Sequence, residues 1–182
     1  MRTRGNSWTA EDLYRLPQDR RYEIDDGRLV AMEPAGFEHA RLAVRITMLL
    51  CAFVVSWGWT VLGGEPGVYL RRAPRQTLRA PDIAVYSRER AAAITDRHGF
   101  PDVPPDLAVE VHDRSERDLG RKIAQYLGCG VRAVWVVDPW KRTVSRHVPG
   151  EPPRLWTVPQ DLFEEPLLAG FSCRVGDIFA ED

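Results

Sequence analysis

Lysine is almost missing from this 182-residue sequence: Lys122 and Lys141 are the only two, and arginine supplies the other basic residues. An excess of either charge is missing too, because the formal net charge is −1. No overall basic field therefore indicates a nucleic-acid binder, and any contact with nucleic acid has to come from a local patch. The scarcity of lysine makes Lys122, which lies within a helical pattern, worth examining for a chemical role.

Cysteine is also scarce. Cys51, Cys129 and Cys173 lie far apart, and no CxxC pair or His/Cys cluster occurs, which argues against structural zinc. The apolar run 46–57 follows Arg45 and is too short to span a bilayer, and the N-terminus has no secretory signal. We therefore expect a reduced, cytoplasmic protein that does not enter a membrane.

Several catalytic signatures are absent as well. The sequence contains no P-loop, no glycine-rich dinucleotide motif, no nucleophile elbow and no HExxH zinc motif. Its length, 44% hydrophobic residues and 28% charged residues are ordinary for a soluble globular protein. We expect one domain over residues 1–182.

The clearest structural signal runs from residue 107 to residue 138. Leu107–Val111 predicts a strand with Glu110 near its C-terminal end, and Ser115 is the expected N-cap of the helix that follows. Val131–Val137 is nearly all apolar, as expected for a strand buried on both faces. Strand, helix and strand at this length predict a right-handed βαβ unit with two parallel strands.

The rest of the chain predicts a mixed α/β fold. We expect a short helix near 7–13, a β-hairpin of 21–24 and 28–32, a long helix near 38–57, strands at 60–62, 68–70 and 80–86, a helical turn at 89–93, an antiparallel pair at 142–148 and 154–158, and an apolar tail at 166–179 that covers a core edge. Residues 71–79 are expected to form a basic loop.

Two carboxylates are candidates for a metal site. Asp82 follows Pro81 and opens a strand, and Glu110 lies near the end of another. If those strands are neighbours, the two side chains converge and offer the oxygen ligands that Mg²⁺ or Mn²⁺ prefers. The alternative is that Pro81-Asp82 is a common turn pair and that Glu110 is simply solvated.

Lys122 strengthens the metal-site interpretation. It lies four residues after Asp118 and four before Tyr126, at the edge of an apolar helix face. A lysine at that place can hold an attacking water or stabilise a pentavalent phosphate. Alternatively, it snorkels to solvent or pairs with Asp118.

Further polar residues form a second tier of candidates. Glu23 lies on the first hairpin, and Glu38 and His39 lie at the start of the long helix. His39 can orient a ligand or shuttle protons near neutral pH, or it can be an ordinary polar residue at a helix start. His112, two residues after Glu110, has the same two interpretations. The arginines of 71–79 are either phosphate contacts or solvated surface.

Short motifs follow one another in a specific order. They are Trp8-Thr9-x-Glu11-Asp12-Leu13, Tyr22-Glu23-Ile24-x-Asp26-Gly27-x-Leu29-Val30-x-Met32, Glu38-His39-Ala40, Pro81-Asp82-Ile83-Ala84, Pro105-Asp106-Leu107-Ala108-Val109-Glu110-Val111, Arg117-Asp118-Leu119-x-x-Lys122-x-x-x-Tyr126 and Gly130-Val131-x-x-Val134-Trp135-Val136-Val137-Asp138-Pro139. This series resembles the Uma-two family of restriction-endonuclease-like proteins, in the PD-(D/E)XK nuclease superfamily. The resemblance covers about Trp8 to Asp138.

The resemblance implies a restriction-endonuclease-like mixed β-sheet flanked by helices, with an N-terminal β-hairpin and a Mg²⁺-dependent phosphodiesterase site. It implies that Asp82 and Glu110 are metal ligands and that Glu23 and His39 complete the site. The superfamily lysine normally comes two residues after the glutamate, where this sequence has His112. In this family the following helix supplies it, which matches Lys122.

Three functions are compatible with these residues. The first is a Mg²⁺- or Mn²⁺-dependent DNA endonuclease, expected to act as a homodimer because many nucleases cut two strands as dimers. The second is a catalytically inactive nuclease-like module that binds nucleic acid or a protein partner. The third is a metal-dependent hydrolase of small phosphate esters.

Overall fold

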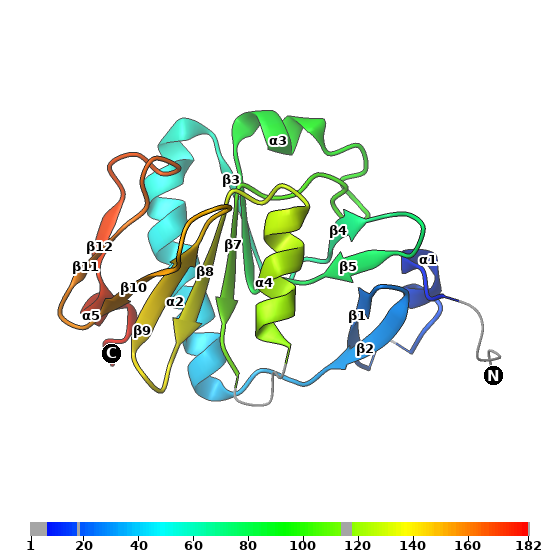
Figure 1. Cartoon of the computed structure of the whole chain (residues 1–182), viewed down its shortest axis with the longest axis horizontal. Helices are drawn as coiled ribbons and strands as arrows, with labels where there is room; N and C mark the ends of the chain where they lie inside the picture. Colours follow the sequence, from blue (N-terminus) through cyan, green and yellow to red (C-terminus); the bar gives the residue numbers. More distant parts are fainter. Residues whose placement is uncertain (1–6, 18, 114–117, 182) are drawn as a thin grey trace.

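The computed structural model describes residues 7–17, 19–113 and 118–181 (Figure 1). In chain order the elements are α1 (Ala10–Leu13), β1 (Arg21–Asp25), β2 (Arg28–Met32), α2 (Phe37–Val54), the 3₁₀ helix η1 (Val55–Trp57), β3 (Thr60–Gly63), β4 (Val68–Arg71), β5 (Thr77–Arg79), β6 (Ile83–Tyr86), α3 (Arg88–Ala93), β7 (Leu107–Val111), α4 (Leu119–Gly128), β8 (Ala133–Asp138), β9 (Thr143–His147), β10 (Arg154–Thr157), β11 (Asp161–Phe163), β12 (Ser172–Arg174) and α5 (Val175–Ile178).

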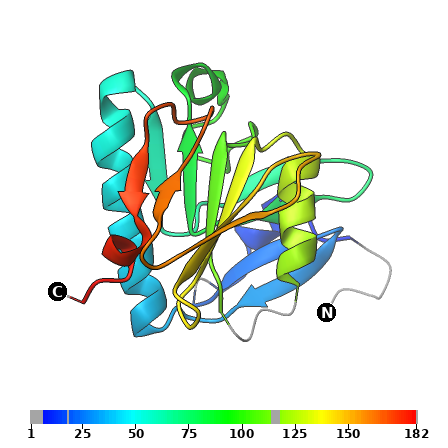
Figure 2. The ribbon, with the colours of Figure 1, turned by 60° about the vertical axis from the view of Figure 1, so that its left-hand side comes forward.

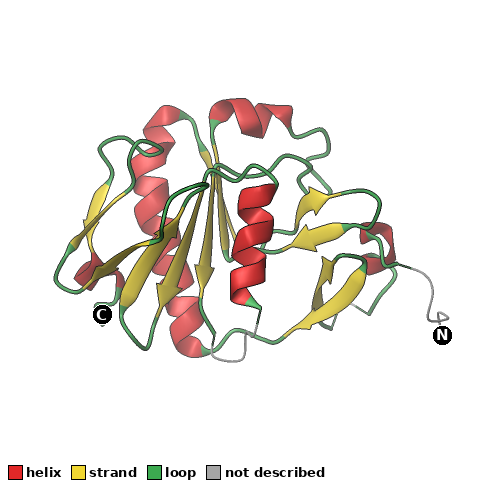
Figure 3. Cartoon of the chain, viewed as in Figure 1, coloured by secondary structure: helices red, strands yellow, loops and turns green. Residues whose placement is uncertain are grey.

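A six-stranded sheet in the order β10-β9-β8-β7-β6-β3 forms the centre of the molecule (Figure 3). Strands β7 and β8 are parallel, and the other neighbouring pairs are antiparallel. The predicted βαβ unit and the mixed α/β fold are therefore confirmed. The predicted N-cap, Ser115, lies outside the described residues; α4 begins at Leu119, after Asp118.

The two faces of this sheet are covered by different helices. Helices α2 and α4 lie on opposite sides of the sheet (Figure 2). Because side chains alternate along a strand, Val109 and Val111 of β7 point to the face where α2 packs, and Ala108 points to the face of α4. The inner side of α2 is buried in the main core, and Tyr126 of α4 is buried on the opposite face. Glu110 therefore belongs to the α4 face.

A second sheet, in the order β2-β1-β5-β4, lies beside the first and carries the predicted hairpin. Its centre is the pairing of Ile24 with Leu78, which pack with Ala10 and Leu13 of α1. The presence of β5 corrects the expectation of a basic loop over 71–79: the last part of that segment is a buried strand.

The C-terminal tail covers the α2 side of the main sheet. Leu168, Phe171 and Val175 are buried in the main core, as expected for the apolar tail. The antiparallel pair of β11 and β12 was not predicted from the sequence. By length and composition alone Phe37–Trp57 is apolar enough to cross a membrane, but one side of α2 is packed into the protein core.

Candidate functional site

The site begins where two strands meet at one edge of the main sheet. Asp82 precedes β6 and Glu110 is near the end of β7. These strands run antiparallel, with Ile83 opposite Val109. The Asp82 Oδ2 atom accepts a hydrogen bond of 2.6 Å from the backbone N–H of Val111. The two strands are therefore neighbours, which was the condition for the two carboxylates to converge, and the hydrogen bond holds the Asp82 carboxylate at the end of β7 that carries Glu110.

Helix α4 supplies the groups that hold Glu110, whose residue surface is only 3% exposed. Lys122 Nζ donates to Glu110 Oε2 at 2.8 Å, and the Tyr126 hydroxyl donates to Glu110 Oε1 at 2.7 Å. Burial raises the pKa of Tyr126 well above its usual range, and the charge of Glu110 adds to this effect. The hydroxyl therefore stays protonated and remains a hydrogen-bond donor.

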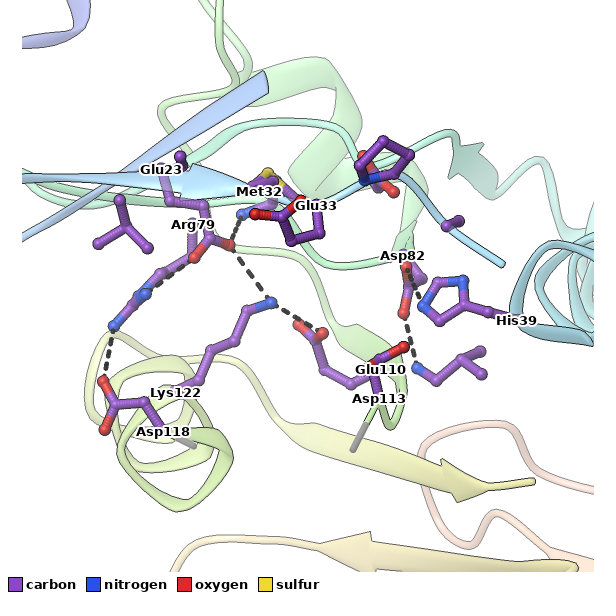
Figure 4. A pocket seen from close by; sticks show the side chains of 17 residues that line it. Glu23, Met32, Glu33, His39, Arg79, Asp82, Glu110, Asp113, Asp118 and Lys122 are labelled. Carbon is purple, nitrogen blue, oxygen red and sulfur yellow. Dashed lines mark hydrogen bonds and ion pairs between the residues drawn. The ribbon is translucent and has the colours of Figure 1, made fainter. Parts of the chain in front are cut away.

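Glu23 reaches the same lysine from the second sheet. Its Oε1 atom lies 3.3 Å from Lys122 Nζ and accepts a 2.8 Å hydrogen bond from the backbone N–H of Ala80. Its Oε2 atom accepts a 2.8 Å bond from Arg79 Nη1. Lys122 is thus held between the carboxylates of Glu23 and Glu110, as Figure 4 shows.

Arg79 joins the second sheet to helix α4. Its Nε donates to Gln125 Oε1 at 2.8 Å, and its Nη2 lies 3.2 Å from Asp25 Oδ2. Burial alone would raise the pKa of Asp25, but the hydrogen bond from Gln125 and the charge of Arg79 lower it overall. The interactions of Arg79 with Glu23, Asp25 and Gln125 thus set the position of β1, which carries Glu23, relative to α4, which carries Lys122.

His39, at the start of α2, approaches the other carboxylate. Its Nε2 atom lies 3.3 Å from Asp82 Oδ1. This interaction raises the pKa of His39 although burial opposes the shift. Its Nδ1 atom is buried and has no hydrogen-bond partner among the described residues. Asp82 is therefore held by His39 on one oxygen and by the backbone of β7 on the other.

These side chains line one cavity of about 460 Å³. Its walls come from the end of β2 and the segment 32–35, the edge formed by β6 and β7, and α4 (Figure 4). Seven carboxylate side chains line it, with two basic side chains and His39: Glu23, Glu33, Glu65, Asp82, Glu110, Asp113, Asp118, Arg79, Lys122. A polyanionic substrate would meet an excess of negative charge here unless cations are bound.

The five residues named as catalytic candidates thus line one cavity: Glu23, His39, Asp82, Glu110, Lys122. Two other candidates, Glu38 and His112, have different surroundings. Glu38 pairs with Arg41 at 2.6 Å on the surface. His112 is not among the cavity-lining residues and packs edge-on against Trp140, with ring centroids 5.9 Å apart.

The arginines of 71–79 have separate environments. Arg71 and Arg75 are close to Asp26, and Arg72 lies over the ring of Tyr69. Arg79 was grouped with them as a phosphate contact or solvated surface, but it is buried at the cavity because Glu23 and Asp25 compensate its charge. No local pattern in the sequence indicates this pairing.

Tyr126 and Gln125 were also missed as site residues. Tyr126 lies on the buried, apolar face of α4, at whose edge Lys122 was expected. A signal was available, because Tyr126 lies four residues after Lys122 and residues at this spacing share a helix face. Only the fold, however, brings its hydroxyl to Glu110.

Comparisons with known proteins agree on the kind of fold. The model of the Uma2 family, described as "Putative restriction endonuclease", matches residues 10–176. Among solved structures, the chain is similar to "a putative nuclease belonging to DUF820 from Anabaena variabilis ATCC 29413". The TM-score is 0.78 and 16% of residues are identical, with 94% of this chain and 97% of that chain covered. No protein of curated function matches. At this identity the structural likeness shows a shared fold.

Proposed function

Because the chain belongs to the Uma2 family, whose description is "Putative restriction endonuclease", we propose that it hydrolyses DNA phosphodiester bonds with the help of a divalent metal ion. The fold and family are nuclease-like. The observation that carries the proposal is the placement of Lys122 between Glu110 and Glu23 in the cavity that Asp82 also lines.

The donor atoms at this edge of the sheet fit Mg²⁺ or Mn²⁺. Asp82 and Glu110 offer hard carboxylate oxygens, and Mg²⁺ is usually held by one or two carboxylates together with waters and substrate phosphates. Each carboxylate oxygen has two lone pairs, so the bonds from Lys122, Tyr126 and Val111 leave acceptor capacity on both side chains. Among the described residues no group of three or more His, Cys, Asp or Glu side chains is arranged to hold a metal ion, so the proposed protein ligands are Asp82 and Glu110 alone.

A metal ion at these carboxylates would supply a water of lowered pKa and neutralise charge on the phosphodiester. Lys122 has a position from which its ammonium group can orient the attacking water and stabilise the charge that develops on the phosphate. Glu23 restrains Lys122 from the second sheet, and Arg79 restrains Glu23 in turn. The two sheets therefore act together to set the position of one ammonium group.

His39 has a supporting role in this proposal. Its contact with Asp82 Oδ1 restricts the rotation of the carboxylate, while the N–H of Val111 restrains Oδ2. The raised pKa of His39 favours the protonated imidazolium, which is a hydrogen-bond donor to Asp82. His39 is thus assigned to positioning Asp82 rather than to a step of bond cleavage.

Nicking of supercoiled plasmid DNA with Mg²⁺ and with Mn²⁺ tests the proposal. The variants are Asp82→Asn and Glu110→Gln, which keep shape and remove charge. Glu164→Gln, at a buried carboxylate outside this cavity, is the matched control. We expect metal-dependent nicking that falls about 100-fold or more in the first two variants and persists in the control. Nicking that is equal in all folded variants would refute the assignment.

A catalytically inactive binding module is the second candidate. It is favoured by one observation: Glu23, Lys122, Glu110 and Tyr126 already satisfy one another as a polar network without a metal ion. In that case the wild type would shift a DNA fragment in a gel without nicking it under any metal condition. Hydrolysis of small phosphodiesters without any action on DNA would instead support a small-ester hydrolase.

A further inference from the structure

The solvent side of helix α2 is apolar, which is unusual for a surface helix. Phe37, Val44 and Met48 are exposed by 85%, 61% and 67%, and they form an apolar stripe along α2. Val55 continues this stripe into η1. A surface helix normally has charged and polar residues opposite its core-facing side. On α2 the only charged residue in the exposed class is Glu38. A helix that is apolar on both sides is expected to be covered on both.

The basic residues beside this stripe are engaged within the chain. Arg41 pairs with Glu38 and donates to the carbonyl oxygen of Ala180. Arg45 donates to the carbonyl oxygen of Asp177 at 2.7 Å. Interfacial membrane helices present arginine and lysine toward lipid headgroups from a polar face, whereas the other face of α2 is packed into the core. The charge arrangement therefore favours a protein surface as the occupant.

The stripe is shaped as a ridge between two grooves. Residues spaced by four along a helix form such a ridge, and here they are Ala40, Val44, Met48 and Ala52, all exposed. One groove, of about 720 Å³, lies toward Asp177 of α5. The other, of about 350 Å³, lies toward the end of β3 and is lined by Thr47, Gly63 and Gly64. Ridges of this kind pack into the grooves of a second helix.

We propose that this surface is the contact between two copies of the chain, with their α2 helices antiparallel and related by a two-fold axis that crosses the exposed side of α2 midway between Val44 and Met48. In that arrangement Val44 faces Met48 of the other copy, and Ala40 faces Ala52, because residues at equal distances from the axis are opposite each other. The small alanines allow the helices to approach. Glu38 is the one charged residue of α2 in the exposed class, while Arg41 and Arg45 are half-buried and donate to carbonyl oxygens within the chain.

The length of α2 sets how large the contact between two copies can be. Helix α2 has 18 residues, which corresponds to a length of about 27 Å. A typical stable interface buries about 800 Å² on each copy, so a contact along α2 also has to include the groove walls from α5 and β3. In Figure 2 the helix stands at the outer edge of the molecule, on the side of the sheet opposite to α4.

The interface would lie beside the candidate site without containing it. The groove on the β3 side is also lined by His39 and Asp82. In two copies joined along α2, the candidate-site cavity of each copy would therefore lie close to the interface. The proposed dimer does not depend on the proposed nuclease activity. It is inferred from the surface of α2, and it is tested by measuring the molar mass of the protein in solution.

Sedimentation equilibrium of the purified full chain, without metal or DNA, is the direct test. We expect the wild type to have twice the mass of one chain. Met48→Glu should raise the dissociation constant about 100-fold or more, because it places a charge at the centre of the contact. Leu155→Glu, at a residue of β10 that is 58% exposed, is the matched control and should remain dimeric. A monomeric wild type, or a folded Met48→Glu variant that stays dimeric, would overturn the proposal.

Cross-linking tests the register. In a Cys51→Ser background, Val44→Cys and Met48→Cys proteins are mixed and oxidised mildly. An antiparallel contact predicts that the mixed pair forms more readily than either self-pair, whereas predominant self-pairs would overturn the arrangement. Binding of a monomeric wild type to anionic phospholipid vesicles, lost in Met48→Glu, would assign the stripe to a membrane surface instead.

Discussion

Two buried glutamates on opposite faces of the main sheet make the most informative comparison in this molecule. Glu110 faces α4, where Lys122 and Tyr126 donate to it. Glu164, in the C-terminal tail, is fully buried on the α2 side, where Arg146 Nε donates at 2.7 Å and the indole N–H of Trp135 also donates. Each carboxylate therefore has one cationic donor and one aromatic donor.

The difference between them lies in what surrounds the pair. Glu110 lines a cavity that contains a second carboxylate, Asp82, held by its own partners. Glu164 is not among the residues that line this cavity, and its interactions tie the tail to β8 and β9. Burial and ion pairing alone thus do not distinguish a catalytic carboxylate from a structural one. The proposal that Glu110 is catalytic rests instead on its access to a cavity that a second carboxylate also lines.

Removal of the cation from each pair should have the largest effect. Lys122→Met and Arg146→Met each leave a buried carboxylate without its cation, so each should lower the free energy of unfolding by about 3–5 kcal/mol. Only Lys122→Met should also reduce plasmid nicking, by about 100-fold or more. Urea unfolding measures stability, and nicking is measured at a temperature where circular dichroism shows both variants folded.

Equal nicking by the folded Lys122→Met and Arg146→Met proteins would break the comparison. Lys122 would then be a structural cation like Arg146, and the binding-module function would be favoured. If Lys122→Met is unfolded at every temperature, Lys122→Arg is measured in its place. This variant keeps the charge but changes the reach and shape of the donor.

A smaller effect is expected from two buried tyrosines. Tyr126→Phe removes a hydrogen bond to the Glu110 carboxylate and should lower the free energy of unfolding by about 1–3 kcal/mol. Tyr86 is equally buried, but its hydroxyl has no hydrogen-bond partner among the described residues. Tyr86→Phe should therefore leave stability unchanged or raise it. Thermal and urea unfolding of both variants would contradict this account if Tyr86→Phe were the more damaging change.

The smallest expected effect is the pH dependence contributed by Glu164. Burial raises the pKa of Glu164 above its ordinary value of 4.5. Between the two pKa values the folded protein holds a proton that the unfolded chain has lost, so the free energy of unfolding falls as pH rises through this window. Glu164→Gln should reduce that fall. Urea unfolding across the acid range checks this, and identical pH slopes for wild type and variant would exclude a contribution from Glu164.

The part of the molecule that could be predicted from sequence is the part set by local patterns. The strand, helix and strand of 107–138 were predicted because their apolar periodicities are strong and continuous. The convergence of Asp82 and Glu110 was expected only on the condition that two predicted strands are neighbours, and the structure pairs these strands. The resemblance of ordered motifs added the remaining candidates, Glu23, His39 and Lys122, which line the same cavity.

The residues that sequence could not assign depend on partners distant along the chain. Arg79 is buried because it meets Glu23, 56 residues earlier, and Glu164 is buried because it meets Trp135, 29 residues earlier. A charged residue in a sequence is expected to be solvated unless a compensating partner is known. No local pattern in the sequence indicates such a partner. Arg79 was therefore placed in the predicted basic loop, and Glu164 was not named as a candidate.

Binding of Mn²⁺ by isothermal titration calorimetry tests the central claim most directly, with wild type, Glu110→Gln and Glu164→Gln measured side by side. We predict that the wild type and Glu164→Gln bind Mn²⁺ alike and that Glu110→Gln loses this binding. Equal Mn²⁺ binding by all three folded proteins would contradict the assignment of Glu110 as a metal ligand and would make the two buried glutamates equivalent structural groups.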